Sequence, residues 1–327
     1  MKIAILGAGA WGSALAASFS SRHAVSLWAR SAAQRDELRR TRASRYLPGI
    51  VLPDAIEFAD SREAALAHAE LAVAATPTSA LRDALQGLTQ GAPSAWLWAC
   101  KGFESGSGCL PHEIAAQCLP AGAEAGALSG PSFAQEVARG LPAAIVVAAQ
   151  EERFAAAMAS SLNGSRLRVY SSSDVVGVEL GGAVKNVIAI AAGIADGLQL
   201  GHNARAALVT RGLAEIARLG TPLGGRAETF AGLAGLGDLV LTCTGDLSRN
   251  RRVGLALARG EPLEHILASL GHVAEGVHST RATLALARHH GIDMPICEAV
   301  HAVLFDAFPA RDAVEKLLSR DPKSETR

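Results

Sequence analysis

Paired cysteines are missing from this sequence of 327 residues. The five cysteines are an odd number without the spacing of a zinc site, and they lie at positions 100, 109, 118, 243 and 297. His112-Glu113 begins like the metalloprotease motif H-E-x-x-H, but Ala116 stands where the second histidine is needed. The sequence therefore predicts neither a metal site nor a disulfide framework, and we expect a protein of the reducing cytoplasm.

An excess of charge of either sign is also missing. Lys and Arg total 31, as do Asp and Glu, so the formal net charge is +0 and no global field gathers nucleic acid or anionic membranes. No apolar run reaches the roughly 18 residues that cross a membrane. Residues 1–18 imitate a short signal peptide, but Gly7, Gly9 and Gly12 interrupt the apolar region. We expect a soluble protein.

Aromatic residues make up only 4% of the chain, but 49% of all residues are hydrophobic, which is enough for about two packed domains. The first half alternates apolar runs with stretches of helical spacing at residues 12–20, 79–88 and 151–162. The apolar runs are at residues 2–6, 25–28, 71–75, 95–100, 126–128 and 143–149. Uninterrupted apolar strands joined by helices predict a mostly parallel, doubly wound sheet covered on both faces.

The pattern changes near residue 175, where strands give way to Ala- and Leu-rich stretches of helical period. These lie at residues 175–198, 204–219, 251–259, 263–269, 279–289 and 297–308. The sequence thus predicts an α/β protein with a Rossmann-like domain over residues 1–174 and an all-helical domain over residues 175–327. We expect residues 321–327 to be a frayed tail.

A glycine motif for a dinucleotide stands at residues 7–12. The sequence Gly7-Ala8-Gly9-Ala10-Trp11-Gly12 is G-x-G-x-x-G, directly after the first strand and at the start of the first helix. The first glycine permits a tight turn, the second lets backbone approach a pyrophosphate, and the third lets helix and strand pack closely. This context predicts a dinucleotide site, and a purely structural glycine loop is the alternative.

The residue that selects the dinucleotide is expected at the end of the second strand. Arg30 lies there, 18 residues after Gly12, where an acidic side chain would hold the ribose of NAD. A guanidinium suits the 2′-phosphate of NADP, so we expect NADP to be accepted and preferred. The alternative is that Arg30 points into solvent. Trp11 either packs on the cofactor or fills the start of the helix.

Lysine is scarce, because only five of the 31 Lys and Arg residues are lysines, at positions 2, 101, 185, 316 and 323. Away from the chain ends stand Lys101 and Lys185. Lys185 lies in an apolar helical pattern, where burial lowers a lysine pKa toward the range of acid–base catalysis. Gly181 and Gly182 precede it by one turn, which predicts space for a ligand on that face. Close helix packing is the alternative reason for these glycines.

Polar groups also follow two strands and begin one helix. Lys101 comes after the strand at residues 95–100, and Ser132 comes after the strand at residues 126–128; both are at carboxyl ends, where open α/β sheets bind ligands. Ser248, Arg249 and Asn250 begin a helix, a setting that suits a phosphate. An ordinary solvated basic turn is the alternative.

Taken in order, several blocks resemble the bacterial type of NAD(P)-dependent glycerol-3-phosphate dehydrogenase, over residues 2 to about 308. They are residues 7–12, 101–104, 129–136, 179–186, 203–205, 235–239, 248–250 and 275–276. The resemblance implies reversible reduction of dihydroxyacetone phosphate to sn-glycerol 3-phosphate for phospholipid synthesis, with NADP(H) or NAD(H) and no metal. We also expect a homodimer, which the apolar helices of the second half allow; the alternative is that the same apolar faces are buried within the protein.

The resemblance further implies roles for individual residues. Lys185 would exchange a proton with the C2 oxygen, and Asp238 would orient and tune Lys185. The substrate would be held by Lys101, Gly130, Ser132, Lys185, Asp238, Ser248, Arg249 and Asn250. The cofactor would contact Gly7, Gly9, Ala10, Trp11, Gly12, Arg30, Lys101, Ala134, Arg249, Val273 and Glu275.

Two other functions remain open on the sequence. A reductase of a β-hydroxyacid or of ketopantoate would also use an interior lysine, but the cluster at residues 248–250 favours a phosphorylated substrate. A non-catalytic NADP-sensing module is disfavoured by Lys185 beside its glycines.

Overall fold

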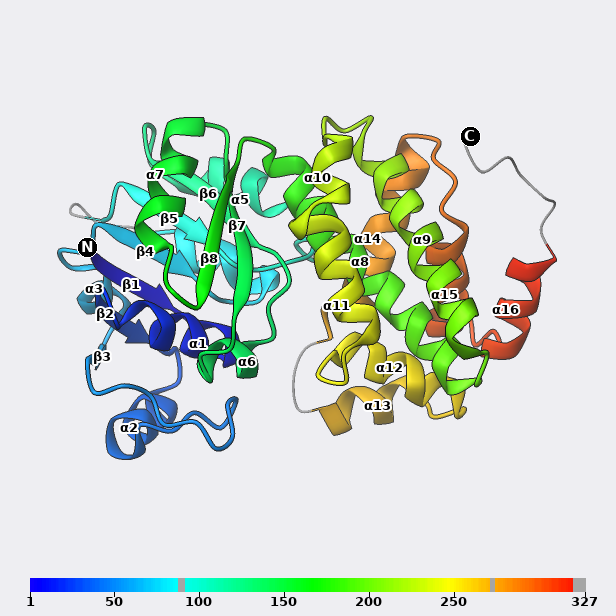
Figure 1. Cartoon of the computed structure of the whole chain (residues 1–327), viewed down its shortest axis with the longest axis horizontal. Coiled ribbons are helices and arrows are strands. Elements are labelled where there is room, and N and C mark those ends of the chain that lie inside the picture. Colours follow the sequence, from blue (N-terminus) through cyan, green and yellow to red (C-terminus); the bar gives the residue numbers. More distant parts are fainter. Residues whose placement is uncertain (88–91, 271–273, 320–327) are drawn as a thin grey trace.

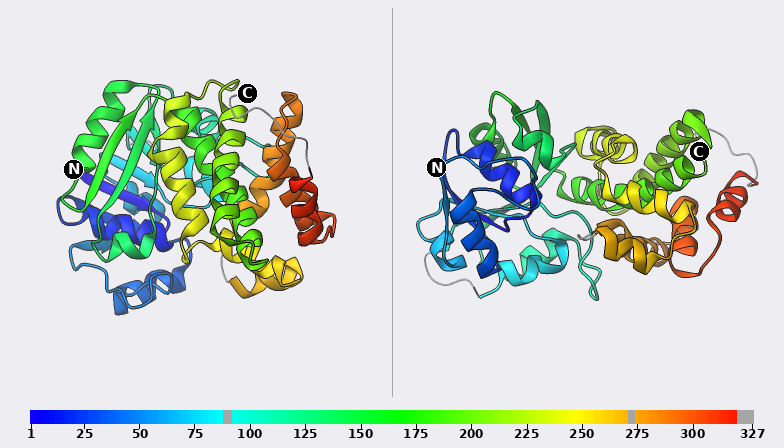
Figure 2. Two further views of the ribbon diagram at one scale, coloured as in Figure 1. Left: turned by 45° about the vertical axis from the view of Figure 1, so that its right-hand side comes forward. Right: turned by 90° about the horizontal axis from the view of Figure 1, so that it is seen from below.

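A sheet and a helical bundle lie side by side in the computed structural model, which describes residues 1–87, 92–270 and 274–319 (Figures 1 and 2). Within these residues one eight-stranded sheet has the order β3-β2-β1-β4-β5-β6-β7-β8, and every neighbouring pair is parallel except β6 and β7. The strands are β1 (Lys2–Leu6), β2 (Ala24–Trp28), β3 (Ile56–Phe58), β4 (Leu71–Ala74), β5 (Ala95–Trp98), β6 (Glu124–Ser129), β7 (Ala143–Ala149) and β8 (Leu167–Ser172).

Helices cover both faces of this sheet. Successive residues of β1 enter different hydrophobic clusters, with Ile3 and Ile5 in one and Ala4 and Leu6 in the other. Side chains alternate across a strand, so both faces are buried, and the doubly wound α/β prediction is confirmed. The connecting elements are α1 (Ala10–Phe19), α2 (Ala32–Thr41), α3 (Arg62–Leu66), a 3₁₀ turn (Thr78–Ala80), α4 (Leu81–Leu85), α5 (Pro111–Cys118), α6 (Ala134–Ala138) and α7 (Glu152–Leu162).

After β8 the described chain is helical. The helical half contains α8 (Val175–Gly197), α9 (Gly201–Gly220), α10 (Ala227–Ala231), a π-helical turn (Leu233–Gly237), α11 (Asp238–Thr244), α12 (Arg249–Ala258), α13 (Leu263–Leu270), α14 (Glu275–His289), α15 (Pro295–Phe305) and α16 (Ala310–Leu318). Helix α8 is central and packs against α9, α11, α12, α14 and α15. The predicted helical second half is confirmed.

Glycines allow α8 and α12 to pack with their backbones in contact. A Cβ atom on Gly193 would lie 2.0 Å from the carbonyl oxygen of Arg251, and one on Gly254 would lie 2.0 Å from that of Ile190. Real Cβ atoms do not approach backbone so closely, and protein interiors have no slack to absorb such a shift. The position of α12, including its first turn, is therefore fixed by α8.

The expectation that no segment could cross a membrane is wrong by length and composition for α8. An 18-residue window of this helix has a mean hydropathy of 1.6. However, 89% of that window is buried inside the protein. A helix that is hydrophobic on all sides is also what the centre of a helical bundle requires, and α8 occupies that place.

Some elements escaped the sequence reasoning. Strand β8 alternates buried and exposed residues at the edge of the sheet, and β3 has only three residues, so neither forms an apolar run. Of the helix predicted over residues 79–88, the described part forms a 3₁₀ turn followed by the short α4, and residue 88 lies outside the described residues. The expected tail at residues 321–327 lies outside the described residues.

Candidate active site

Two lysines from distant parts of the sequence meet at one buried carboxylate. Lys101 lies just after β5, and its Nζ is 2.6 Å from Oδ2 of Asp238. Lys185 of α8 pairs with Oδ1 of the same side chain. Asp238 begins α11 and is 1% exposed, whereas Lys185 is 5% exposed. The sheet and two helices thus bring together the two interior lysines and the acid that the sequence singled out.

Thr242 belongs to this cluster but escaped the sequence reasoning. Lys185 Nζ donates to Thr242 Oγ1 at 3.0 Å, and that hydroxyl donates to the carbonyl oxygen of Asp238 at 2.6 Å. Asp238 and Thr242 are four residues apart and so lie on one face of α11. The spacing was readable, but the glycine-rich segment before it concealed the helix.

Charge and burial together set the proton affinity of Lys185. Burial lowers the pKa of Lys185 to about 8, with Asp238 opposing this change and Lys101 adding to it. Burial alone would raise the pKa of Asp238, but Lys101 and Lys185 hold it below its ordinary value. The carboxylate is therefore held in its charged form, and both protonation states of Lys185 are accessible near neutral pH, which is what a general acid or base requires.

Gly181 and Gly182 do not leave space for a ligand, so that expectation is wrong. A Cβ atom on Gly181 would lie 2.9 Å from the carbonyl oxygen of Ala234. One on Gly182 would lie 3.3 Å from Oγ of Ser129 and 3.4 Å from Cγ of Lys101. The first glycine admits the π-helical turn, and the second admits the stem of Lys101, so close packing is their function.

The carbonyl oxygen of Gly130 joins the loop after β6 to this cluster. It accepts a hydrogen bond from Lys101 Nζ at 3.1 Å and one from Ser132 Oγ at 3.0 Å. Gly130 has a φ of +124°, a conformation that side chains rarely adopt. The loop after β6 and the residue after β5 therefore lie together at the carboxyl edge of the sheet, as predicted for both.

The first turn of α12 lies beside α8. Ser248 is buried, and its Oγ caps α12 by accepting the backbone N–H of Arg251 at 3.2 Å. Asn250 Nδ2 donates to Oδ1 of Asn186 at 2.9 Å, and Asn250 Oδ1 accepts the N–H of Gly276 at 3.0 Å. Asn186 follows Lys185 directly and was also missed from the sequence. The turn is therefore built into the core rather than solvated throughout.

Two arginines of this turn, Arg249 and Arg252, are exposed. Arg249 stands between the buried Ser248 and Asn250. Cations and helix N-termini both attract phosphate, so the turn offers a guanidinium and backbone N–H groups to an anion.

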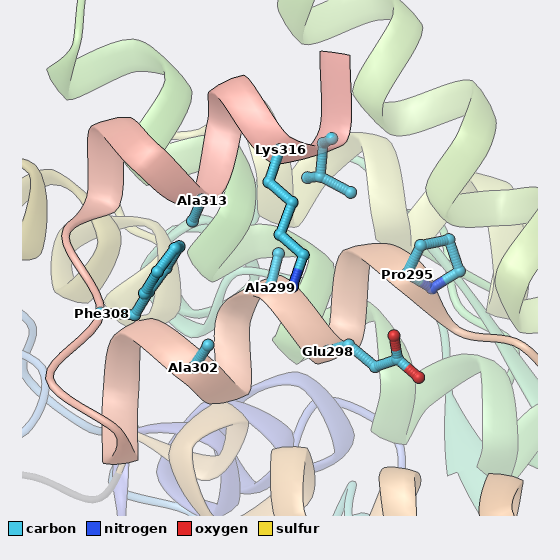
Figure 3. A pocket seen from close by; sticks show the side chains of 8 residues that line it. Pro295, Glu298, Ala299, Ala302, Phe308, Ala313 and Lys316 are labelled. Atoms are coloured by element: carbon cyan, nitrogen blue, oxygen red, sulfur yellow. The ribbon is translucent and has the colours of Figure 1, made fainter. Parts of the chain in front are cut away.

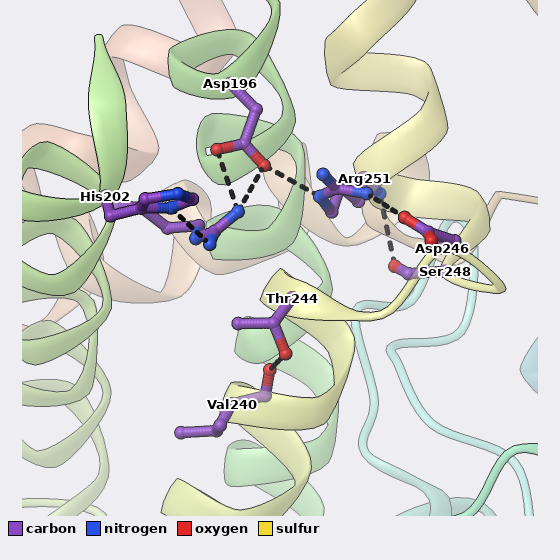
Figure 4. A network of polar contacts seen from close by, with 8 residues as sticks. Asp196, His202, Val240, Thr244, Asp246, Ser248 and Arg251 are labelled. Carbon is purple, nitrogen blue, oxygen red and sulfur yellow. Dashed lines mark hydrogen bonds and ion pairs between the residues drawn. The ribbon is translucent and has the colours of Figure 1, made fainter. Parts of the chain in front are cut away.

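An ion-pair network anchors the chain that leads into this turn (Figure 4). Arg251 Nε donates to Oδ2 of Asp196 at 2.8 Å, and its Nη1 lies 2.9 Å from Oδ1 of Asp246. Asp196 near the end of α8 also pairs with Arg205 of α9 at 3.2 Å. Three helices, α8, α9 and α12, are therefore linked through one aspartate, Asp196, and this linkage holds Arg249 and Asn250 in place.

The glycine loop has the geometry of a phosphate-binding turn. Gly7 has a φ of +111° and donates its N–H to the carbonyl oxygen of Trp28 at 2.8 Å. A Cβ atom on Gly12 would lie 1.9 Å from the carbonyl oxygen of Gly7, whereas one on Gly9 would meet nothing within 4 Å. Helix α1 has no side-chain cap at its N-terminus. The loop is therefore closed at Gly12 but open at Gly9, which fits a pyrophosphate there.

The other expected cofactor residues are spread around this loop. Arg30 is exposed two residues past β2, and Trp11 is half-buried against two hydrophobic clusters, so the tryptophan at least fills the start of α1. Ala10 begins α1, and Ala134 begins α6, which packs on α1. Val273 lies outside the described residues.

Glu275 lies near the cluster from the side of α14. Its Oε2 would be 3.5 Å from a Cβ atom on Gly102, the residue after Lys101. Burial raises the pKa of Glu275 above the ordinary value of a glutamate, although Arg249 opposes this. Glu275 thus lies close to the end of β5 and interacts electrostatically with Arg249.

A cavity of about 150 Å³ lies elsewhere, between α15 and α16 (Figure 3). It contains none of the residues expected to be functional and is lined by Pro295, Glu298, Ala299, Ala302, Phe308, Ala313, Lys316 and Leu317. Over residues 1–87, 92–270 and 274–319, no group of three or more His, Cys, Asp or Glu side chains could hold a metal ion. Within the described chain, the expected catalytic residues therefore lie in the lysine cluster and not at this cavity.

Comparisons with known proteins agree on one family. The models for the N-terminal and C-terminal parts of NAD-dependent glycerol-3-phosphate dehydrogenase match residues 2–155 and 174–315. The chain is 57% identical over 327 residues to "Glycerol-3-phosphate dehydrogenase [NAD(P)+]" of Thiobacillus denitrificans, covering 99% of this chain and 100% of that protein. The protein of the same name from Dechloromonas aromatica is 55% identical, with 99% of each covered.

Solved structures give the same picture. The crystal structure of glycerol-3-phosphate dehydrogenase from Coxiella burnetii has a TM-score of 0.92 and 41% identity, and the match covers 98% of this chain and 99% of that one. A ketopantoate reductase from Ralstonia eutropha has a TM-score of 0.58 and 16% identity, covering 97% of this chain and 100% of that one, which indicates a shared fold alone.

Proposed function

The chain belongs to the NAD-dependent glycerol-3-phosphate dehydrogenase family, and we propose that Lys185 exchanges the proton of that reaction with the C2 oxygen of the substrate. The protein is an oxidoreductase that interconverts dihydroxyacetone phosphate and sn-glycerol 3-phosphate, a phospholipid precursor. When bound, NADPH or NADH supplies the hydride that reaches C2. The chain itself positions the substrate and handles the proton.

The observation that carries the proposal is the sharing of Asp238 by two lysines. During reduction, the ammonium of Lys185 gives its proton to the C2 oxygen; during oxidation, the neutral amine takes it back. A pKa of about 8 makes both forms available near neutral pH. Asp238 holds Lys185 in place through Oδ1, and Lys101 on Oδ2 adds a positive charge that stabilises negative charge on the C2 oxygen.

Recognition of the substrate phosphate falls to the start of α12 in this proposal. The guanidinium of Arg249 contacts the phosphate, and Asn250 and Ser248 fix the turn that carries it. Gly130 and Ser132 hold the remainder of the substrate beside Lys101. Binding of the distant phosphate places C2 against Lys185, so binding energy is used to lower the barrier.

For the cofactor, we propose the glycine loop as the pyrophosphate site and Arg30 as the contact for the 2′-phosphate of NADP. The open face of Gly9 and the uncapped start of α1 support the former. The proposed cofactor contacts are Gly7, Gly9, Ala10, Trp11, Gly12, Arg30, Lys101, Ala134, Arg249, Val273 and Glu275.

The proposal also includes the domain division, the oligomeric state and the cellular location of the protein. Residues 1–174 form the cofactor domain and residues 175–327 the substrate domain; the change from β8 to α8 at Asp174 supports this division. A homodimer is supported by large exposed apolar side chains on the helical half, at Leu200, Val240 and Leu247. A cytoplasmic location is supported by five free cysteines.

This function is tested by mixing the purified protein with NADPH and a candidate substrate and following the loss of NADPH absorbance. Dihydroxyacetone phosphate should support turnover, whereas ketopantoate and the no-substrate control should not, and a β-hydroxyacid should not reduce NADP. Lys185→Ala should still bind NADPH but lose about 10²–10⁴-fold in kcat. Lys185→Arg should be equally slow, because a guanidinium does not release its proton near neutral pH. Near-normal turnover in either variant would refute the role of Lys185.

A further inference from the structure

Glu179 is a buried acid in α8 that the proposed reaction does not use. It is 6% exposed, and its two oxygens make three hydrogen bonds. Oε1 accepts the indole N–H of Trp98 at 2.7 Å and the backbone N–H of His112 at 2.9 Å. Oε2 lies 2.6 Å from Nδ1 of the same histidine. Glu179 therefore joins three elements, because Trp98 belongs to β5, His112 to the first turn of α5 and Glu179 itself to α8.

These bonds lie close along the chain to both lysines of the active site. Trp98 is the last residue of β5, and Lys101 follows three residues later. Along α8, Gly182 is three residues from Glu179 and three from Lys185, so it neighbours each of them on the adjacent turn of the helix. Gly182 is the residue against which the stem of Lys101 packs. The carboxylate of Glu179 thus joins β5 to α8 within one turn of the place where Lys101 crosses.

We propose that Glu179 is a positioning residue that fixes the end of β5 against α8 and thereby sets the distance between Lys101, Asp238 and Lys185. This inference rests on the proposed function of the lysine cluster. A buried carboxylate is costly unless its oxygens are bonded, and here every partner comes from the sheet half. The hydrogen bonds of Glu179 thus hold the sheet half of the site against α8.

The reason that small shifts matter is electrostatic as well as steric. The charge of Lys101 lowers the pKa of Lys185, and this effect depends on how far Lys101 lies from Asp238 and Lys185. If β5 moved away from α8, Lys101 would leave the carboxylate, and the pKa of Lys185 would rise. A displacement of about 1 Å at a catalytic group can cost about 100-fold in rate.

Two tryptophans of the same strand provide a matched test. Trp98→Phe keeps an aromatic side chain but removes the indole N–H that reaches Glu179, together with the rest of the five-membered ring. Trp96→Phe removes an equally buried N–H that donates at 2.7 Å to the carbonyl oxygen of Pro93, with no link to α8. Trp98→Phe should lower kcat about tenfold or more and move the pH midpoint of kcat for glycerol 3-phosphate oxidation upward from about 8. The KM for NADPH should stay unchanged.

Trp96→Phe should leave kcat and the pH midpoint as in the wild type. A second pair of variants separates positioning from folding. Glu179→Gln keeps an oxygen for Trp98 and the His112 N–H, so it should retain most of the kcat that Glu179→Ala loses. Equal kinetic effects of the two tryptophan variants, or a loss confined to thermal stability, would overturn the proposal. If Lys185→Ala were fully active, the proposed function itself would fail, and that result is independent of the tryptophan pair.

Discussion

The ammonium of Lys101 lies 2.6 Å from the carboxylate of Asp238, and this ion pair joins residues 137 positions apart across the two halves of the protein. The same carboxylate pairs with Lys185. One negative charge therefore faces two positive charges in a buried setting, which leaves the site with one unbalanced cation when both lysines are protonated. Such a site attracts an anionic substrate and stabilises negative charge that develops on a carbonyl oxygen.

The first prediction concerns this surplus charge. Lys101→Met removes a cation that lowers the pKa of Lys185, so that pKa should rise above about 8. Oxidation needs the neutral amine, and its pH profile should therefore move toward higher pH. The measurement is kcat against pH for glycerol 3-phosphate oxidation. Lys316→Met, at an exposed position of α16 outside the lysine cluster, is the control and should leave the profile in place. A profile that stays fixed or moves to lower pH in Lys101→Met would contradict the assignment.

Much of the fold could be predicted because its signals are local. A strand, a glycine turn and a helix at residues 2–19 follow from apolar runs and glycine spacing alone. The π-helical turn and α11 could not be predicted in this way, because Gly235 and Gly237 disfavour helix. The structure gives the reason for Gly235: its Cβ atom would lie 2.1 Å from the carbonyl oxygen of Phe230. Tertiary packing there overrides helix propensity.

The site could be predicted only in part. Lys185 was recognisable as a rare cation in an apolar helix, but its contact with Thr242 depends on how α11 packs against α8. Gly182 was misinterpreted because its neighbour, the stem of Lys101, comes from 81 residues earlier in the chain. The sequence around one residue indicates whether that residue is buried and charged. Its contact partner depends on long-range packing, which the sequence around it does not reveal.

A second prediction concerns cofactor choice. Arg30 is exposed at the end of the second strand, so Arg30→Ala should not disturb the core. The KM for NADPH should rise about tenfold, the equivalent of about 1.4 kcal/mol, because a charge-assisted bond to the 2′-phosphate is lost. The KM for NADH, which lacks that phosphate, should change little and is the internal control. Equal losses for both cofactors would show that Arg30 does not recognise the 2′-phosphate.

A third prediction follows from Glu215, a buried acid of α9. Its oxygens accept the backbone N–H groups of Ile296 at 2.7 Å and Cys297 at 3.3 Å. Burial raises the pKa of Glu215 to about 7. A carboxyl with a raised pKa in the folded state stabilises the protein below its unfolded pKa, and that stability is lost as the pH rises through about 7.

Glu215→Gln should therefore gain thermal stability relative to the wild type as the pH increases. Between about pH 5 and about pH 8.5, the difference in unfolding free energy should shift in favour of the variant by up to about 3 kcal/mol. Thermal melts at both pH values measure it. Glu298→Gln, which removes an exposed carboxylate from the first turn of α15, should show no comparable shift. A difference independent of pH would mean that Glu215 keeps the same charge throughout this range.

The last prediction separates the folding and binding roles of the glycine loop. A methyl group on Gly12 would lie 1.9 Å from the carbonyl oxygen of Gly7, so Gly12→Ala should destabilise the protein by about 1–3 kcal/mol or more. A methyl group on Gly9 would meet nothing within 4 Å, so Gly9→Ala should keep the wild-type Tm. It should nevertheless lose NADPH affinity, because the methyl group would occupy the face that the pyrophosphate approaches. Thermal melts and NADPH fluorescence titration distinguish these outcomes. If Gly9→Ala bound NADPH normally, the open face at Gly9 would not be the pyrophosphate site, whatever the fate of Gly12→Ala.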